Sequence, residues 1–139
     1  MIVSPTNKLI LRNDTMGSGF FLAPRKGRPH FGCDFKCTPN QHVYAPINGE
    51  ITRQFLVYGD STHFRGIEIQ GWVEIYQKHI KALARLMYVD LCHFMLNQEV
   101  KAGDKIAYAQ NIRERYGATM LPHVHCEIYL DPMGLVGLK

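Results

Sequence analysis

The sequence has no hydrophobic run of the roughly 18 residues that a membrane-spanning helix requires. It also lacks the pattern of a secretory signal peptide, because the apolar stretch within residues 1–12 is short and no small-residue cleavage site follows it. Internal repeats and low-complexity segments are absent as well. These absences exclude a membrane-spanning helix, and they predict that another agent delivers the protein if it acts outside the cytoplasm.

Cysteine pairs are missing too. The four cysteines, Cys33, Cys37, Cys92 and Cys126, include no Cys-x-x-Cys pair, which argues against a structural zinc site built from thiolates. In a chain without an export signal we expect these residues to be reduced, buried thiols. Cys33 and Cys126 each adjoin a candidate metal ligand, so strand alternation predicts that their side chains face the other way.

Charge of one sign is not concentrated in any part of the chain. The sequence has 16 Lys and Arg residues against 12 Asp and Glu residues, for a net charge of +4, and its tightest basic group is Arg25, Lys26 and Arg28. No basic-aromatic motif of a known nucleic-acid-binding module is present, so we expect no nucleic-acid partner. A mild positive charge does suit a polyanionic surface such as a bacterial cell wall.

What the sequence does contain is enough for one globular domain with a single core: 139 residues, 46% of them hydrophobic and 20% charged. Turn-forming residues separate short segments of strand character over most of the length. We therefore predict a mainly β fold, a single compact domain of antiparallel β-sheets with a metal-binding groove and little helix.

The positions of the turn-forming residues predict the individual elements. Asn48-Gly49 predicts a hairpin turn, and residues 75–86 predict a short helix or long loop that leads into a strand at 84–89. A turn is expected within residues 100–107 and a helical turn within 111–116. The other predicted strands span residues 9–12, 33–37, 42–45, 50–57 and 66–70, with 73–76 as the partner of the last.

A His-x-His pattern near the C-terminus is the first candidate for chemistry. In an extended strand His123, His125 and Glu127 share one face, although two ordinary strand histidines would give the same pattern. A second cluster lies far upstream, where His30 and Asp34 stand four residues apart. A His, an Asp and one His of the downstream pair would supply three ligands and leave a position open for water, as in catalytic zinc sites.

The two clusters belong to a longer series of motifs, which are His30-x-Gly32-x-Asp34, Val43-Tyr44-Ala45-Pro46, Gly49, Val100-Lys101-x-Gly103 and His123-x-His125-x-Glu127-Ile128. In this order they resemble the lysostaphin-type (LytM-like) zinc endopeptidases, which cut peptidoglycan peptides. Residues 17–30 are more specifically similar to the leukocyte cell-derived chemotaxin 2-like and phage members. The resemblance divides the chain into an N-terminal segment, 1–16, and a lysostaphin-type peptidase domain, 17–139.

The resemblance implies a role for each matching residue. His30, Asp34 and His125 would hold zinc, and Asp34 would lower the net charge of that site to +1. His123 would be the base that takes a proton from the attacking water, a role that an imidazole can fill near neutral pH.

One position departs from the family pattern. Active members have a further histidine where this chain has Tyr88, and the chemotaxin-like proteins also have tyrosine there. A neutral phenol can donate a hydrogen bond to an oxyanion, so we predict that Tyr88 takes part in catalysis in place of an imidazole. His93 is an alternative second histidine, but its odd offset from Tyr88 disfavours it.

The function that follows is a zinc-dependent endopeptidase acting on peptide bonds of bacterial peptidoglycan. It would work at the cell wall or in the periplasm as a phage lysis enzyme (endolysin) or a tail-associated component of a bacteriophage, with a virion or other protein as a further partner and no membrane partner. The alternative is a non-catalytic zinc-binding interaction module, which Tyr88 favours and an intact His123 disfavours. A groove that binds wall peptide without cutting it is a third interpretation.

Overall fold

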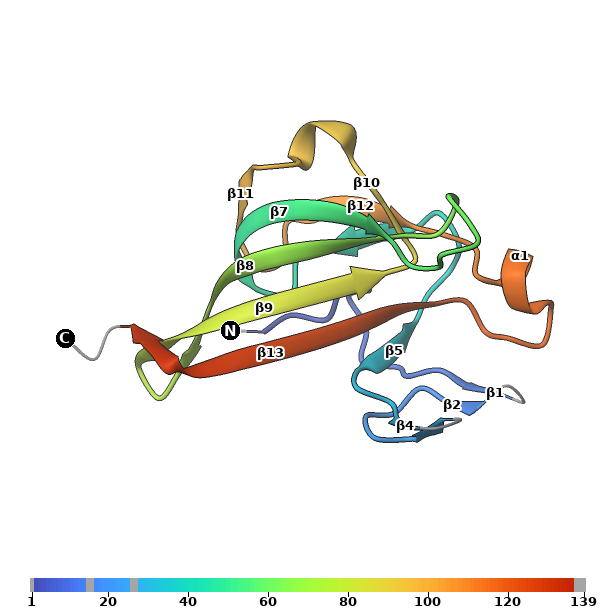
Figure 1. The fold of residues 1–139 in the computed structure, drawn as a ribbon, viewed down its shortest axis with the longest axis horizontal. Coiled ribbons are helices and arrows are strands. Elements are labelled where there is room, and N and C mark those ends of the chain that lie inside the picture. Colours follow the sequence, from blue (N-terminus) through green and yellow to red (C-terminus); the bar gives the residue numbers. More distant parts are fainter. Residues whose placement is uncertain (1, 15–16, 26–27, 137–139) are drawn as a thin grey trace.

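A six-stranded antiparallel sheet is the main element of the computed structural model, which describes residues 2–14, 17–25 and 28–136 (Figure 1). In spatial order its strands are β11 (Glu99–Val100), β7 (Asn48–Leu56), β8 (Arg65–Ile75), β9 (Lys78–Met87), β13 (His123–Val136) and β5 (Cys33–Lys36). The long strands β8, β9 and β13 form its centre, and β5 lies at one edge.

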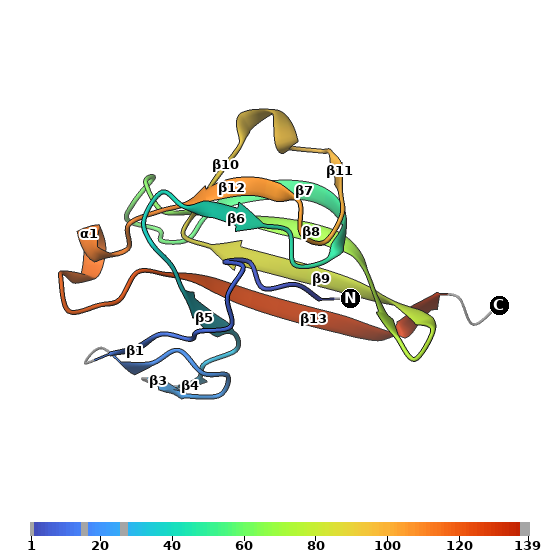
Figure 2. The same cartoon turned by 180° about the vertical axis from the view of Figure 1, so that it is seen from behind.

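A smaller sheet lies against one face of the larger one, as both views show (Figure 2). Its strands, in spatial order, are β10 (Val89–Leu91), β12 (Lys105–Ala109) and β6 (His42–Tyr44). Two short ribbons add to the described β structure: β1 (Asn13–Asp14) with β2 (Gly17–Ser18), and β3 (Pro24–Arg25) with β4 (Arg28–Pro29). Where a strand at 9–12 was predicted, the structure has an isolated antiparallel bridge between Leu11 and Phe35. Helix is limited, in the described residues, to η1 (His93–Met95) and α1 (Arg113–Tyr116). The predicted fold class is confirmed.

The core fills the space between the two sheets. Alternate residues of β8 and β9 point into it, including Ile67, Ile69 and Leu86, which are fully buried. Each such side chain contributes about 1.5–3 kcal/mol through burial. The intervening residues of the same strands face outward, so one face of the large sheet remains available for polar side chains. None of the described helices is long and apolar enough to span a membrane.

Several predicted elements are confirmed to within two residues. The predicted strands at 33–37, 42–45 and 50–57 correspond to β5, β6 and β7, and the helical turn at 111–116 contains α1. The turn within residues 100–107 separates β11 from β12.

The predicted hairpin turn at Asn48-Gly49 is wrong, because both residues begin strand β7. Gly49 pairs with Gly71 across the sheet, and a Cβ on Gly49 would lie 2.4 Å from the carbonyl oxygen of Gln70. The glycine at this position therefore permits a close approach of two backbones rather than a turn.

The predictions for residues 66–89 are also partly wrong. Residues 73–76 are not a partner strand, because β8 continues through them to Ile75, and β9 occupies the stretch where a helix or loop was expected. The two strands are joined by Tyr76 and Gln77, with φ values of 50° and 63°. A two-residue turn with both φ positive suits a tight hairpin, but it usually contains Asn or Gly, so Tyr-Gln gave no signal for it.

The described N-terminal residues run alongside the smaller sheet and then β5. The Val3 amide donates to the Pro46 carbonyl, and the Lys36 amide of β5 donates to the Ile10 carbonyl. The Arg12 amide donates to the Asp34 carbonyl at 2.7 Å, which brings the Arg12 side chain next to that carboxylate. The division of the chain at residues 16 and 17 stays a prediction.

Candidate metal centre

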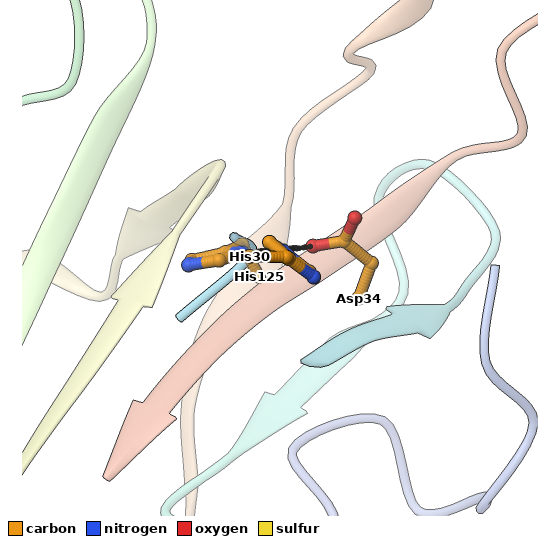
Figure 3. A group of neighbouring side chains, drawn as sticks. All are labelled: His30, Asp34 and His125. Atoms are coloured by element: carbon orange, nitrogen blue, oxygen red, sulfur yellow. Dashed lines mark hydrogen bonds and ion pairs between the residues drawn. The ribbon is translucent and has the colours of Figure 1, made fainter. Parts of the chain in front are cut away.

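Strands β5 and β13 bring three predicted ligands together (Figure 3). Asp34 and His125 are cross-strand partners in the antiparallel register, so strand pairing places one opposite the other. His30 lies three residues before β5, and its backbone amide donates to the Ala23 carbonyl at 2.9 Å. All three side chains are buried, with 3–8% of their surfaces exposed.

The three candidate ligand atoms converge on one point. The Nδ1 atom of His125 lies 2.8 Å from Oδ1 of Asp34 and 2.9 Å from Nε2 of His30, and that Nε2 atom lies 3.2 Å from the same Oδ1. Figure 3 shows the two rings and the carboxylate pointing toward one another. The cluster therefore offers two imidazole nitrogens and one carboxylate oxygen.

Each candidate ligand is oriented by a partner on its other side. The Nδ1–H group of His30 donates to the carbonyl of Phe20 at 2.9 Å, and the Nε2–H group of His125 donates to Oε2 of Glu127 at 2.7 Å. The second oxygen of Asp34 accepts from Nε of Arg12 at 3.1 Å. These contacts orient the rings so that Nε2 of His30 and Nδ1 of His125 face the centre of the cluster. There each nitrogen can donate a proton to Asp34 or, once deprotonated, offer its lone pair to a metal ion.

Electrostatics favour the charged form of the carboxylate. Burial alone would raise the pKa of Asp34, but hydrogen bonds with His125 and His30 hold it well below its ordinary value. Burial would likewise lower the pKa of His125, yet its hydrogen bonds to Asp34 and Glu127 raise it above the ordinary value. Asp34 is therefore ionised at neutral pH, and His125 is held in an environment that stabilises positive charge.

The residues fit a divalent metal ion. Once the inner nitrogens are deprotonated, with both outer N–H groups still donating outward, lone pairs of His30, His125 and Asp34 would face one another at 2.8–3.2 Å. A shared cation would stabilise that arrangement. Ligands of a tetrahedral zinc at about 2.0–2.1 Å from the metal are about 3.3 Å apart, close to these separations. Mixed imidazole and carboxylate ligation suits zinc.

His123 lies beside the cluster on the same face of β13. Its Nδ1–H group donates to the Leu121 carbonyl at 2.8 Å, which leaves Nε2 unprotonated and 3.7 Å from Oδ2 of Asp34. Burial lowers the pKa of His123 below its ordinary value, although the nearby Asp34 opposes this. At neutral pH the side chain is therefore a neutral imidazole with a lone pair directed toward the cluster, as a general base requires.

Tyr88 borders His123 from the end of β9, with the two rings in an edge-to-face contact at 5.3 Å. Its hydroxyl accepts a hydrogen bond from Tyr58 at 3.2 Å, and the hydroxyls of Tyr58 and Tyr116 are 2.8 Å apart. The guanidinium of Arg115 stacks on the Tyr58 ring at 3.6 Å. We call Tyr58, Tyr88 and Tyr116 the tyrosine wall. Tyr58 and Tyr116 were not predicted, because no local motif connects residues 58 positions apart.

The fold, with this cluster at the edge of its large sheet, is similar to three solved structures of lysostaphin. The NMR solution structure of lysostaphin matches with a TM-score of 0.57 and 20% identity over 86% of this chain and 44% of that chain. The structure of the antimicrobial peptidase lysostaphin from Staphylococcus simulans matches with a TM-score of 0.54 and 19% identity over 85% of this chain and 45% of that chain. The catalytic domain of the same peptidase, crystallised in the absence of phosphate, matches with a TM-score of 0.51 and 19% identity over 90% of this chain and 87% of that chain. The fold is lysostaphin-type.

Comparison of sequences alone gives a weaker result than comparison of structures. No family model matches the chain. Myeloid protein 1 of Gallus gallus is 36% identical over 72 residues, which cover 49% of this chain and 22% of that protein. The chain thus spans less than a quarter of the length of this curated relative, and the likeness to lysostaphin concerns the fold.

On this lysostaphin-type fold a row of alternating charges extends from the cluster across the outer face of the large sheet. Glu127, Arg85, Glu68 and Arg53 are successive cross-strand partners on β13, β9, β8 and β7. Nε of Arg53 donates to Glu68 at 2.6 Å, and Arg85 lies 3.8 Å from Glu68 and 3.7 Å from Glu127. The sequence shows Glu127 on the face of His125, but the rest of the row becomes visible only once the strand register is known.

The remaining histidines lie elsewhere in the lysostaphin-type fold. His93 is in η1, above the smaller sheet in Figure 1, where its ring contacts Phe94. His63 is exposed and pairs with Glu114 at 3.0 Å. The partly buried His42 packs against Tyr108, and the exposed His79 stacks on Trp72. The structure therefore gives no support to His93 as the second histidine.

The four cysteines are free thiols. Cys33 and Cys126 are cross-strand partners, in the register pair next to that of Asp34 and His125. Cys126 packs in the core, on the opposite side of β13 from His125. Burial raises the pKa of Cys126 to about 12, so it is protonated at neutral pH. A neutral, buried thiol pointing away from the cluster is not a metal ligand there.

Proposed function

We propose that the protein is a zinc-dependent endopeptidase that hydrolyses peptide bonds in bacterial peptidoglycan. The observation that carries this proposal is the convergence of three buried ligand atoms, from His30, Asp34 and His125, beside the neutral imidazole of His123. The lysostaphin-type fold supports the reaction class, and the sequence motifs support the substrate. Residues 17–139 would form the peptidase domain.

His30, Asp34 and His125 would hold the zinc ion through Nε2, Oδ1 and Nδ1. When bound there, zinc supplies a Lewis acid that polarises a carbonyl group and lowers the pKa of a water ligand from about 15.7 toward 7. Arg12 balances the charge of Asp34, and Glu127 keeps the His125 ring turned so that Nδ1 faces inward.

The proton transfers fall to His123 and Tyr88. The Nε2 lone pair of His123 accepts the proton of the attacking water, and the resulting imidazolium can donate it to the leaving amine. Tyr88 accepts a hydrogen bond from Tyr58, so its own hydroxyl proton remains free to donate to the oxyanion of the substrate. Burial raises the pKa of Tyr88 to about 12, so this donor stays protonated throughout the neutral range.

The biological setting proposed is a phage lysis enzyme or a tail-associated virion component that acts at the cell wall or in the periplasm. A net charge of +4 suits an anionic wall. The substrate in this setting is a peptidoglycan peptide, and a virion or other protein would be a further partner.

A second candidate function is a zinc-binding module that acts through protein contacts without cutting peptides. Tyr88 favours it, because a phenol replaces the imidazole expected at that position and its hydroxyl is already bonded to Tyr58. The orientation of His123 favours catalysis instead, since a binding module has no need of a base with its lone pair directed at the metal centre.

One experiment separates the two functions. The zinc-loaded protein is incubated with purified peptidoglycan between pH 6 and 9, and new amino termini are counted against His123→Ala. Release by the wild type but not by His123→Ala supports the endopeptidase. If the wild type binds zinc yet releases no amino termini at any pH, the non-catalytic module is the better description.

A further inference from the structure

A hollow distinct from the metal centre lies on the large sheet over strands β8, β9 and β13. It is open to solvent and provides about 450 Å³ of space, a volume within the range of small-ligand sites. Its lining comes from three consecutive residues on each strand: Gln70, Gly71 and Trp72 of β8, Lys81, Ala82 and Leu83 of β9, and Tyr129, Leu130 and Asp131 of β13. We call this hollow the distal trough.

The distal trough opens on the same face of the sheet as the metal centre. Tyr129 follows His125 and Glu127 at intervals of two residues, so alternation puts the three side chains on one face. Gln70 and Leu83 lie in the same register row as Tyr129. Gly71, Ala82 and Leu130 form the next row, whose backbone provides the floor.

Tyr129 links the two sites directly. Its hydroxyl donates to Glu127, the carboxylate that orients His125, and Tyr129 is also one of the residues that line the trough. With about 3.3 Å per residue, the middle of the trough is about 17 Å along β13 from His125. One face of the sheet thus connects a hollow with the candidate catalytic centre.

The walls of the trough are aromatic and partly open to solvent. Trp72 is 38% exposed and Tyr129 is 45% exposed, so both side chains present aromatic surface to solvent at the hollow. His79 stacks on the Trp72 indole at 6.2 Å and 29°, and this contact steadies the ring beside the hollow. Leu83 contributes an aliphatic surface between the two aromatic residues.

The polar groups of the trough suit a neutral ligand. Lys81 and Asp131 carry opposite charges that cancel, and the amide of Gln70 both donates and accepts hydrogen bonds. A site of zero net charge gives no preference to a polyanion, although the chain as a whole is basic. Donors and acceptors around an aromatic surface match a sugar ring, which has hydroxyls at its edge and C–H groups on its face.

We propose that the distal trough binds an N-acetylated sugar ring of a glycan strand. This inference rests on the proposed function, because peptidoglycan consists of such sugars with short peptides attached. An extended peptide spans at most about 3.3–3.6 Å per residue, so about five residues bridge the 17 Å between the trough and the metal centre. A sugar held in the trough would keep its attached peptide over the sheet and present the far end of that peptide to His123.

The test uses the fact that Trp72 is the only tryptophan of the chain. Chitotriose, a trimer of N-acetylglucosamine, is titrated into the metal-free protein while tryptophan fluorescence is recorded. A saturable change is expected, and Tyr129→Ala should weaken the apparent affinity about tenfold, because one aromatic wall is lost. Tyr108→Ala removes an aromatic side chain that is similarly exposed, at 43%, but lies on β12 of the smaller sheet, and it should leave the titration unchanged.

Three results would overturn the proposal. The first is no fluorescence change with chitotriose, and the second is an equal loss of affinity in Tyr129→Ala and Tyr108→Ala. The third is a change caused by a stem peptide without sugars but not by chitotriose, which would make the trough a peptide site. Because the titration needs neither zinc nor cleavage, sugar binding without release of amino termini would contradict only the proposed hydrolysis, and cleavage without sugar binding would contradict only the trough.

Discussion

The metal cluster and the tyrosine wall lie on two sides of His123 and are built in different ways. Asp34 and His125 are register partners on adjacent strands, and each is held by a buried partner behind it. The tyrosine wall instead joins the end of β9 to two connecting segments through hydroxyl contacts of 2.8 and 3.2 Å. From this difference we propose a division of labour, in which the cluster would determine metal affinity and the wall would affect the rate of the chemical step.

The largest expected effect is the loss of metal binding in His125→Ala. The substitution removes one of three ligands, and metal affinity should fall by more than about 100-fold, beyond the 10–100-fold typical of losing an outer partner. Competition with a chromophoric chelator measures the affinity, and peptidoglycan cleavage should disappear with it.

His42→Ala is the matched control, since His42 packs against Tyr108 away from the cluster. It should bind zinc like the wild type. If His125→Ala retained wild-type affinity, the metal would have to lie elsewhere and the comparison of the two regions would lose its basis.

Tyr88→Phe should reduce kcat about 10²–10³-fold, the usual cost of losing one oxyanion donor. Zinc affinity should stay unchanged, because Tyr88 contacts His123 and not the three ligands through its ring. Single-turnover cleavage together with chelator competition separates the two quantities.

Tyr88→His sharpens the same test, because it restores an imidazole at this position and should raise turnover above the wild type. A loss of zinc affinity in Tyr88→Phe, or an unchanged kcat, would show that the wall has no separate role in the chemistry.

The same contrast explains how much of the site could be predicted from sequence. Ligand candidates on strands are visible because alternation assigns His123, His125 and Glu127 to one face, and because His30 and Asp34 lie close together in the chain. Whether the two clusters meet depends on the pairing of β5 with β13, which only the structure shows. Their role as ligands stays a prediction.

The parts that could not be predicted depend on long-range register or on unusual backbone. Tyr58 and Tyr116 meet because two connecting segments fold against each other, and neither segment contains a recognisable motif. The β8–β9 hairpin was missed because Tyr76 and Gln77 adopt positive φ without Asn or Gly. Gly49 was misread because a glycine required for close backbone approach looks the same in sequence as a glycine in a turn.

Glu127→Gln tests the partner behind a ligand. An amide keeps the shape but weakens the hydrogen bond from His125, so zinc affinity should fall about 10–100-fold. Chelator competition again gives the affinity. Glu74→Gln is the control, because it changes an exposed carboxylate near the C-terminal end of β8 and should leave zinc affinity unchanged. Equal losses of zinc affinity in both variants would mean that the charge of the carboxylate matters, and not its orientation of His125.

The pH dependence of kcat/KM should show the ionisation of His123 and that of Tyr88 separately. The base must be neutral to accept a proton, and because burial lowers the pKa of His123, the acid limb of kcat/KM should lie below pH 6.5, with about a tenfold loss per unit below it. The pKa of Tyr88 is raised to about 12, so its ionisation should cause no loss up to about pH 10. An acid limb well above 6.5 that persists in Tyr88→Phe would exclude His123 as a base with a lowered pKa.

The smallest effect is expected where the wall meets solvent. Tyr58→Phe removes the hydrogen bond to the Tyr88 hydroxyl, which in the proposed mechanism leaves the Tyr88 proton free for the oxyanion. A bond of this kind contributes about 1 kcal/mol, so its loss should reduce kcat about fivefold. Tyr116→Phe acts one step further away and should cost less, while both variants should bind zinc normally. Single-turnover rates for the two variants and for the double variant with Tyr88→Phe decide the matter, since Tyr58→Phe should add nothing once the Tyr88 hydroxyl is gone. If the losses instead add in full, Tyr58 acts on the reaction independently of Tyr88, and the wall is not a single hydrogen-bonded unit.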